Sequence, residues 1–179
     1  MLLYLFTLKE EGKDLFGGKE ITPAGVLYLP ARDAVVSGSR AMSEEERKKA
    51  VDKQLKRSGV VLSDPDVLSA MEHGEDGFRF LPIKVKTSGE ITGEALLSAE
   101  QLGKLERHTR KVLEEVAGEL AAGKIAADPF WRGPQHNACL WCQYAAACQF
   151  REGHGGDKRR FIPSVSAEDF WEQLSDRSK

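Results

Sequence analysis

The sequence predicts a mixed α/β fold of the α+β kind, in which strands and helices are followed by a separate cysteine segment. Apolar residues in the short alternating runs typical of strands recur between residues 23 and 86. Two stretches with helical character open with capping pairs. All three cysteines of the 179-residue chain lie within residues 139–148. We therefore expect a mixed domain over residues 1–130, a cysteine segment over 131–150, and a linker with a terminal helix over 151–179.

The composition is that of an ordinary globular protein. Charged residues make up 30% of the chain and apolar residues 41%, with a formal net charge of −2. Such a charge gives no general attraction to nucleic acid or membranes, so binding has to come from local patches. No apolar run approaches the ~20 residues that span a bilayer, and the first residues lack the features of a signal peptide. We expect a cytoplasmic protein without membrane association.

The chain opens on an almost continuous apolar stretch, "LLYLFTL". We interpret it as the last turns of a buried helix that ends at residues 9–12. No Ser, Thr, Asp or Asn precedes it to cap the helix. A helix that is apolar all round needs packing partners on every side. We therefore expect this chain to be the later part of a longer protein.

Strands and a helix follow in the next third of the chain. Residues 23–36 are rich in strand-forming residues and predict a strand or a pair of strands, which Pro30 limits or interrupts. Residues 43–57 predict a helix with mixed charges. Ser43 and Glu46 have the spacing of a capping box, in which each side chain bonds the other residue's backbone amide.

The middle of the chain offers a short strand at residues 59–62, a turn at Asp64 and Pro65, and a short helix. Asp64 and Asp66 superficially resemble metal ligands, but the turn chemistry favours two solvated carboxylates. Residues 78–86 alternate between apolar and polar positions, which predicts a further strand.

The clearest predicted helix covers residues 98–122, with its apolar residues on one stripe. Ser98 and Gln101 form a second capping pair, and Gly123 is the expected C-terminal cap. A short terminal helix is expected after Ser166, a plausible N-cap.

The cysteine spacing indicates a metal or cluster site. Two residues separate Cys139 from Cys142, and five more precede Cys148. A two-residue gap lets two thiolates reach one centre. Three interpretations remain open: three buried free thiols, a zinc site with His136 as fourth ligand, and an iron–sulfur cluster whose fourth thiolate lies outside this chain. The C-x3-C-x2-C spacing of radical-SAM enzymes is not present.

The stretch "CLWCQYAAAC", a C-x2-C-x-Y-x3-C pattern, resembles the C-terminal signature of iron–sulfur-containing RecB-like nucleases of the PD-(D/E)XK superfamily. Residues 1–150 resemble most closely the C-terminal part of the AddB family, the second subunits of bacterial AddAB helicase–nucleases. The stretches "MLLYLFTLKEEGKDLFGGKEITPAGVLYLPARD" and "SAEQLGKLERHTRKVLEEVAGELAAGKIAADPF" support this. The resemblance implies that the fold is the C-terminal portion of a RecB-like nuclease domain.

The resemblance also implies a 4Fe–4S cluster. In that family three cysteines follow the nuclease core and the fourth precedes it by hundreds of residues. Cys139, Cys142 and Cys148 match the three that follow. The fourth ligand is then expected outside this chain, with the cluster tying the end of the subunit back across the nuclease domain.

The family's nuclease chemistry uses an Asp, a second acid and a Lys around Mg²⁺, followed by a Q-x-x-x-Y motif. Tyr4 matches the final Tyr, in a supporting role, and its Gln would precede Met1. The metal-binding acids, the Lys and the Mg²⁺ are thus expected only in the complete nuclease. The resemblance implies a subunit of an ATP-dependent DNA helicase/exonuclease in double-strand break repair, acting with an AddA-like helicase–nuclease subunit. This chain is expected to be inactive alone.

Local cations suggest where DNA could be contacted. Lys158, Arg159 and Arg160 lie next to Phe161, the combination of cations and an aromatic ring that single strands favour. The alternative function is a non-enzymatic zinc module that binds nucleic acid or protein, with His136 completing the metal site.

Overall fold

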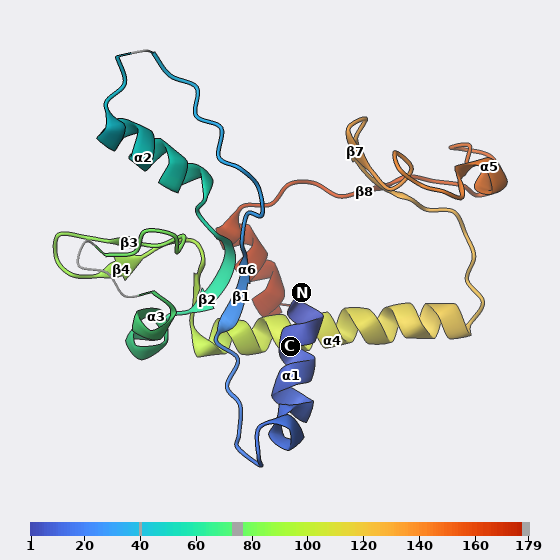
Figure 1. Cartoon of the computed structure of the whole chain (residues 1–179). Helices are drawn as coiled ribbons and strands as arrows, with labels where there is room; N and C mark the ends of the chain where they lie inside the picture. Colours follow the sequence, from blue (N-terminus) through green and yellow to red (C-terminus); the bar gives the residue numbers. More distant parts are fainter. Residues whose placement is uncertain (40, 73–76, 177–179) are drawn as a thin grey trace. The chain divides into compact units, whose positions relative to one another are not determined.

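The computed structural model describes residues 1–39, 41–72 and 77–176 (Figure 1). Helices and strands are mixed along the chain, which confirms the predicted fold class. The chain divides into two compact units. The first is Met1–Thr109 and the second begins at Arg110, so the boundary falls inside the long helix α4 (Ala99–Ala121).

Helix α1 (Leu2–Leu15) begins without a side-chain cap, as expected, but the prediction that it ends at residues 9–12 is wrong. The helix continues through Gly12, which is buried. A Cβ at this position would collide with the Ile21 side chain, so the glycine permits close packing there. The prediction of a buried helix is also wrong for this chain, because Phe6 is 7% exposed while Leu3 is 47% exposed.

The first unit contains a sheet with the strand order β1-β2-β5. Strand β2 (Ser58–Leu62) pairs antiparallel with β1 (Gly25–Tyr28) and parallel with β5 (Leu96–Leu97). The predicted strand at 59–62 is confirmed. Of the predicted strand region 23–36, only β1 is a strand, and it stops before Pro30.

The core of the first unit forms where β2 meets helix α3 (Pro65–Met71). Its central side chains are at most 1% exposed: Val61, Leu68, Leu81 and Ile83. Asp64 caps α3, because its Oδ1 accepts the backbone N–H groups of Asp66 at 2.9 Å and Val67 at 3.1 Å. Asp64 is therefore a helix cap rather than the solvated turn carboxylate that we predicted.

The predicted helix starts are confirmed. Helix α2 (Glu44–Gln54) opens with the complete Ser43–Glu46 capping box. Helix α4 opens with Ser98 Oγ accepting the Gln101 N–H, while Gln101 Oε1 accepts the Ser98 N–H. In helix α6 (Ala167–Asp176), Ser166 Oγ accepts the Asp169 N–H at 3.1 Å. Gly123, at φ 66°, follows α4 in the left-handed conformation expected of a C-terminal cap.

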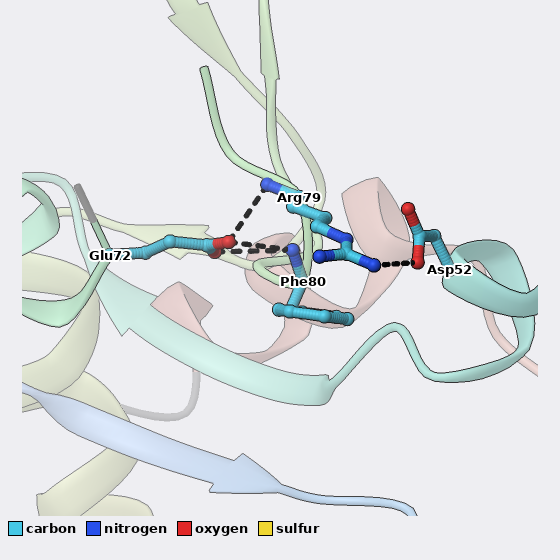
Figure 2. A network of polar contacts seen from close by, with 4 residues as sticks. All are labelled: Asp52, Glu72, Arg79 and Phe80. Carbon is cyan, nitrogen blue, oxygen red and sulfur yellow. Dashed lines mark hydrogen bonds and ion pairs between the residues drawn. The ribbon is translucent and has the colours of Figure 1, made fainter. Parts of the chain in front are cut away.

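The predicted strand at residues 78–86 is largely wrong. Only β3 (Lys84–Val85) is a strand, paired antiparallel with β4 (Ile91–Thr92). The preceding backbone instead turns around the carboxylate of Glu72, as Figure 2 shows. That carboxylate accepts three successive backbone N–H groups at 2.9–3.2 Å, those of Arg79, Phe80 and Leu81.

The second unit contains a sheet with the order β7-β6-β8. Strand β6 (Phe130–Gly133) pairs antiparallel with β7 (His136–Asn137) and parallel with β8 (Arg160–Phe161). The cysteine segment follows β7 and contains the short helix α5 (Ala145–Cys148). Among the helices that the structure describes, none is both long and apolar enough to cross a membrane.

Candidate metal centre

Asn137 fixes the start of the cysteine segment. Its Nδ2 donates to the carbonyl oxygens of Gly133, at 3.1 Å, and Pro134, at 2.9 Å. Its Oδ1 accepts the backbone N–H of Cys139 at 3.0 Å. One side chain thus closes the β6–β7 hairpin and holds the first cysteine. Sequence reasoning missed this residue, although an Asn two residues before a turn is a recognisable Asx signal.

Successive backbone turns carry the chain from one cysteine to the next. The N–H of Cys142 donates to the carbonyl of Cys139 at 3.3 Å, and the N–H of Ala145 donates to that of Cys142 at 3.4 Å. The N–H of Cys148 then donates to the carbonyl of Tyr144 at 2.8 Å within α5. These turns supply the compact local backbone that a closely spaced ligand set requires.

The three cysteines are free thiols. Cys139 is half-buried, whereas Cys142 and Cys148 are exposed, so the hypothesis of three buried thiols is wrong. Three thiolates suit an iron–sulfur cluster that takes another ligand from elsewhere. Within the described residues, no group of three or more His, Cys, Asp or Glu side chains is gathered as a metal site. His136 lies exposed on β7, and its role as a zinc ligand stays an untested alternative.

The cations predicted to contact DNA have different surroundings. Arg159 lies over the ring of Trp131, with its Cζ 3.9 Å from the centroid, and its Nη1 is 3.0 Å from a Glu152 carboxylate oxygen. Lys158 and Arg160 are exposed. The predicted DNA contact stays a prediction. Because Arg159 is engaged within the chain, Lys158 and Arg160 are the better placed to meet phosphates.

Tyr4 lies on α1 and its side chain is 71% exposed. Asp64, one of the two carboxylates considered as a metal ligand, is used in capping α3. Nothing in the described part of the chain therefore replaces the acids and Lys expected of a complete nuclease site. The supporting role of Tyr4 stays a prediction.

The fold and the cysteine segment together define a class of protein. The model of the PD-(D/E)XK nuclease superfamily matches residues 1–149, and the chain belongs to this superfamily.

Particular relatives narrow the comparison, and all three described here are named as the same subunit of an ATP-dependent helicase/deoxyribonuclease. The chain is 28% identical over 177 residues to that of Thermoanaerobacter sp. (strain X514), covering 97% of this chain and 15% of the relative. The Symbiobacterium thermophilum protein is 31% identical over 176 residues, with 98% and 15% covered. The Desulforamulus reducens protein is 33% identical over 152 residues, with 84% and 13% covered. The resemblance found in the sequence is confirmed, and the chain spans about 15% of the length of the first two of these relatives.

Proposed function

We propose that this chain is the cluster-bearing C-terminal part of an AddB-like subunit of an ATP-dependent helicase/deoxyribonuclease, and that Cys139, Cys142 and Cys148 hold a 4Fe–4S cluster. The observation that carries the proposal is the similarity to such helicase/deoxyribonuclease subunits along 97% of the chain. The cysteines lie within that similarity, and their spacing suits cluster ligation.

The chain's own residues would build one side of the cluster site. Asn137 holds the backbone of Cys139, and the turns that follow bring Cys142 and Cys148 onto the same short segment. The exposure of the latter two thiols leaves room for a ligand from another segment. When bound, the cluster supplies covalent cross-links between thiolates that are distant in sequence, which stabilises the fold by restricting the unfolded chain.

The parent activity follows from the relatives' name. We propose that the complete subunit degrades DNA with a helicase–nuclease partner during repair of double-strand breaks. The catalytic acids, Lys and Mg²⁺ then belong to the part of the subunit outside this chain. Tyr4 supports that site, and Lys158 and Arg160 contact DNA near the cluster segment.

The cluster proposal is tested by anaerobic reconstitution of the chain with iron and sulfide, with excess dithiothreitol to supply the missing ligand. We expect iron and acid-labile sulfide in equal amounts and a brown protein. Cys139→Ser, Cys142→Ser and Cys148→Ser should each lose the cluster, whereas His136→Ala should keep it. Colourless protein with one zinc per chain, released by His136→Ala, would contradict the proposal and support the zinc module.

The parent activity is tested with a chimera in which this chain replaces the matched region of the Symbiobacterium thermophilum protein. Co-expressed with that protein's own partner, the chimera should retain ATP-dependent degradation of linear DNA. The same chimera carrying Cys142→Ser should lose it. A folded, cluster-loaded chimera without any DNA degradation would contradict the proposal.

A further inference from the structure

The first unit carries a groove that none of the predicted sites uses. It lies between the start of β2 and the β3–β4 hairpin and has a volume of about 730 Å³. We call it the cationic groove. Its charged side chains are Lys56, Arg57, Lys84 and Glu94. The hydroxyl residues Ser58 and Thr92 also line it.

The cations of the groove differ from their neighbours in having no carboxylate partner. Lys86 pairs with Glu90 at 2.8 Å, and Arg79 pairs with Asp52. Within the described residues, no ion pair involves the side chains of the three groove cations. Three unpaired cations against one carboxylate give the groove an excess of positive charge in a chain whose net charge is −2. Such a local excess attracts anions.

The wall that carries Arg57 is tied to the loop before β3. The Arg57 N–H donates to the Phe80 carbonyl at 2.9 Å, and Asp52 on α2 binds the Arg79 side chain (Figure 2). The Asp52 pair lowers the pKa of that carboxyl, chiefly through the hydrogen bond from Arg79.

The loop itself is held by Glu72, which accepts its successive backbone N–H groups (Figure 2). The groove therefore has a fixed backbone frame, from which long cationic side chains project. A fixed frame reduces the ordering cost of binding a charged ligand.

We propose that the cationic groove binds phosphodiester groups of a DNA strand. Lys and Arg side chains together with hydroxyl groups are the usual partners of backbone phosphates, and they position a strand without reading its sequence. The choice of DNA as the source of the phosphates rests on the proposed function. Lys56 and Lys84, both exposed and on opposite walls, contact the strand, and Glu94 limits its affinity by repulsion.

The test is binding of a fluorescein-labelled single-stranded oligonucleotide to the 179-residue chain over a series of salt concentrations. The double variant Lys56→Ala/Lys84→Ala should bind about tenfold more weakly, with the log–log salt slope reduced by roughly 1.4, about 0.7 for each lost phosphate contact. Glu94→Gln should bind roughly twofold more tightly, because it removes a charge that repels phosphate. The matched control is Lys86→Ala, in the same hairpin but outside the groove lining.

Each outcome bears on the proposal. Loss in the double variant, gain in Glu94→Gln and no change in Lys86→Ala would support it, provided that circular dichroism shows unchanged folding. Wild-type affinity in the double variant, an equal loss in Lys86→Ala, or binding of inorganic phosphate without binding of DNA would overturn it. The readout requires neither a cluster nor cleavage. Failure of the groove therefore leaves normal iron and sulfide contents, whereas failure of the proposed function alters those contents.

Discussion

The β1-β2-β5 region and the cysteine segment are ordered by different means. Around β2, apolar side chains such as Leu68 and Leu81 are at most 1% exposed. In the cysteine segment, Trp141 is 89% exposed and Tyr144 is 74% exposed. Of the buried apolar side chains in the described chain, only Leu174 belongs to the second unit.

The difference indicates what each region needs in order to be stable. Burial of apolar surface contributes most of the free energy that offsets chain entropy, so the first unit has a source of stability of its own. The cysteine segment has backbone turns and one Asn side chain, but little buried surface. Small regions that lack a core are commonly stabilised by a metal or by disulfides. The cluster that we propose would fill this role.

The largest contrast is expected from core truncation. Leu81→Ala removes a side chain that is 0% exposed, and should lower the free energy of unfolding by about 2–5 kcal/mol. Leu140→Ala in the cysteine segment, where the side chain is 42% exposed, should change it by less than about 0.5 kcal/mol. Urea denaturation followed by far-UV circular dichroism measures both. Equal losses would show that the two regions share one kind of core.

The Glu72 clamp offers a second contrast, because here backbone groups depend on a side chain. Glu72→Ala leaves three N–H groups without their acceptor and should cost about 1–3 kcal/mol of stability. Glu72→Gln keeps one acceptor oxygen and should cost less. Urea denaturation of the two variants measures both losses. A neutral Glu72→Ala would mean that water replaces the carboxylate at no cost.

Helix capping is expected to act on the two units with similar, smaller effects. Ser98→Ala at the start of α4 and Ser166→Ala at the start of α6 each remove a side-chain acceptor, at about 1 kcal/mol per cap. Thermal unfolding of each variant, with Ser69→Ala on the exposed face of α3 as a control, measures the effect. Caps matter least where a helix is already held by packing, so a smaller loss at Ser98 would sharpen the comparison.

The smallest effect concerns pH. The hydrogen bond from Arg79 holds the pKa of the Asp52 carboxyl below its ordinary value of 3.8. A carboxyl with a lowered folded-state pKa contributes stability above its unfolded pKa and loses it as pH falls through the folded value. Asp52→Asn should therefore be less stable than wild type at pH 7, with the gap closing below about pH 4. Urea midpoints between pH 3 and pH 7 test this, and a gap that widens in acid would contradict it.

Local signals predicted much of the fold. The capping pairs at Ser43, Ser98 and Ser166 were readable because both partners lie within four residues of each other. The strand predicted at 78–86 failed because Glu72, seven to nine residues away, takes the N–H groups that a neighbouring strand would need. Period-two alternation cannot reveal such a competitor.

The candidate site shows the same limit. The cysteine spacing and the Asx signal at Asn137 are local, and the second was overlooked rather than hidden. The stacking of Arg159 on Trp131 and the grouping of Lys56 with Lys84 join residues 28 positions apart. Such contacts depend on strand register, which a single sequence specifies only through the folded sheet.

The central claim is that an inorganic cluster, rather than buried side chains, orders the cysteine segment. Hydrogen exchange of the reconstituted chain against the cluster-free chain tests it most directly. We predict slower exchange of the amides in residues 139–149 when the cluster is bound, with residues 58–72 unchanged. Identical exchange of residues 139–149 in both states would contradict the claim.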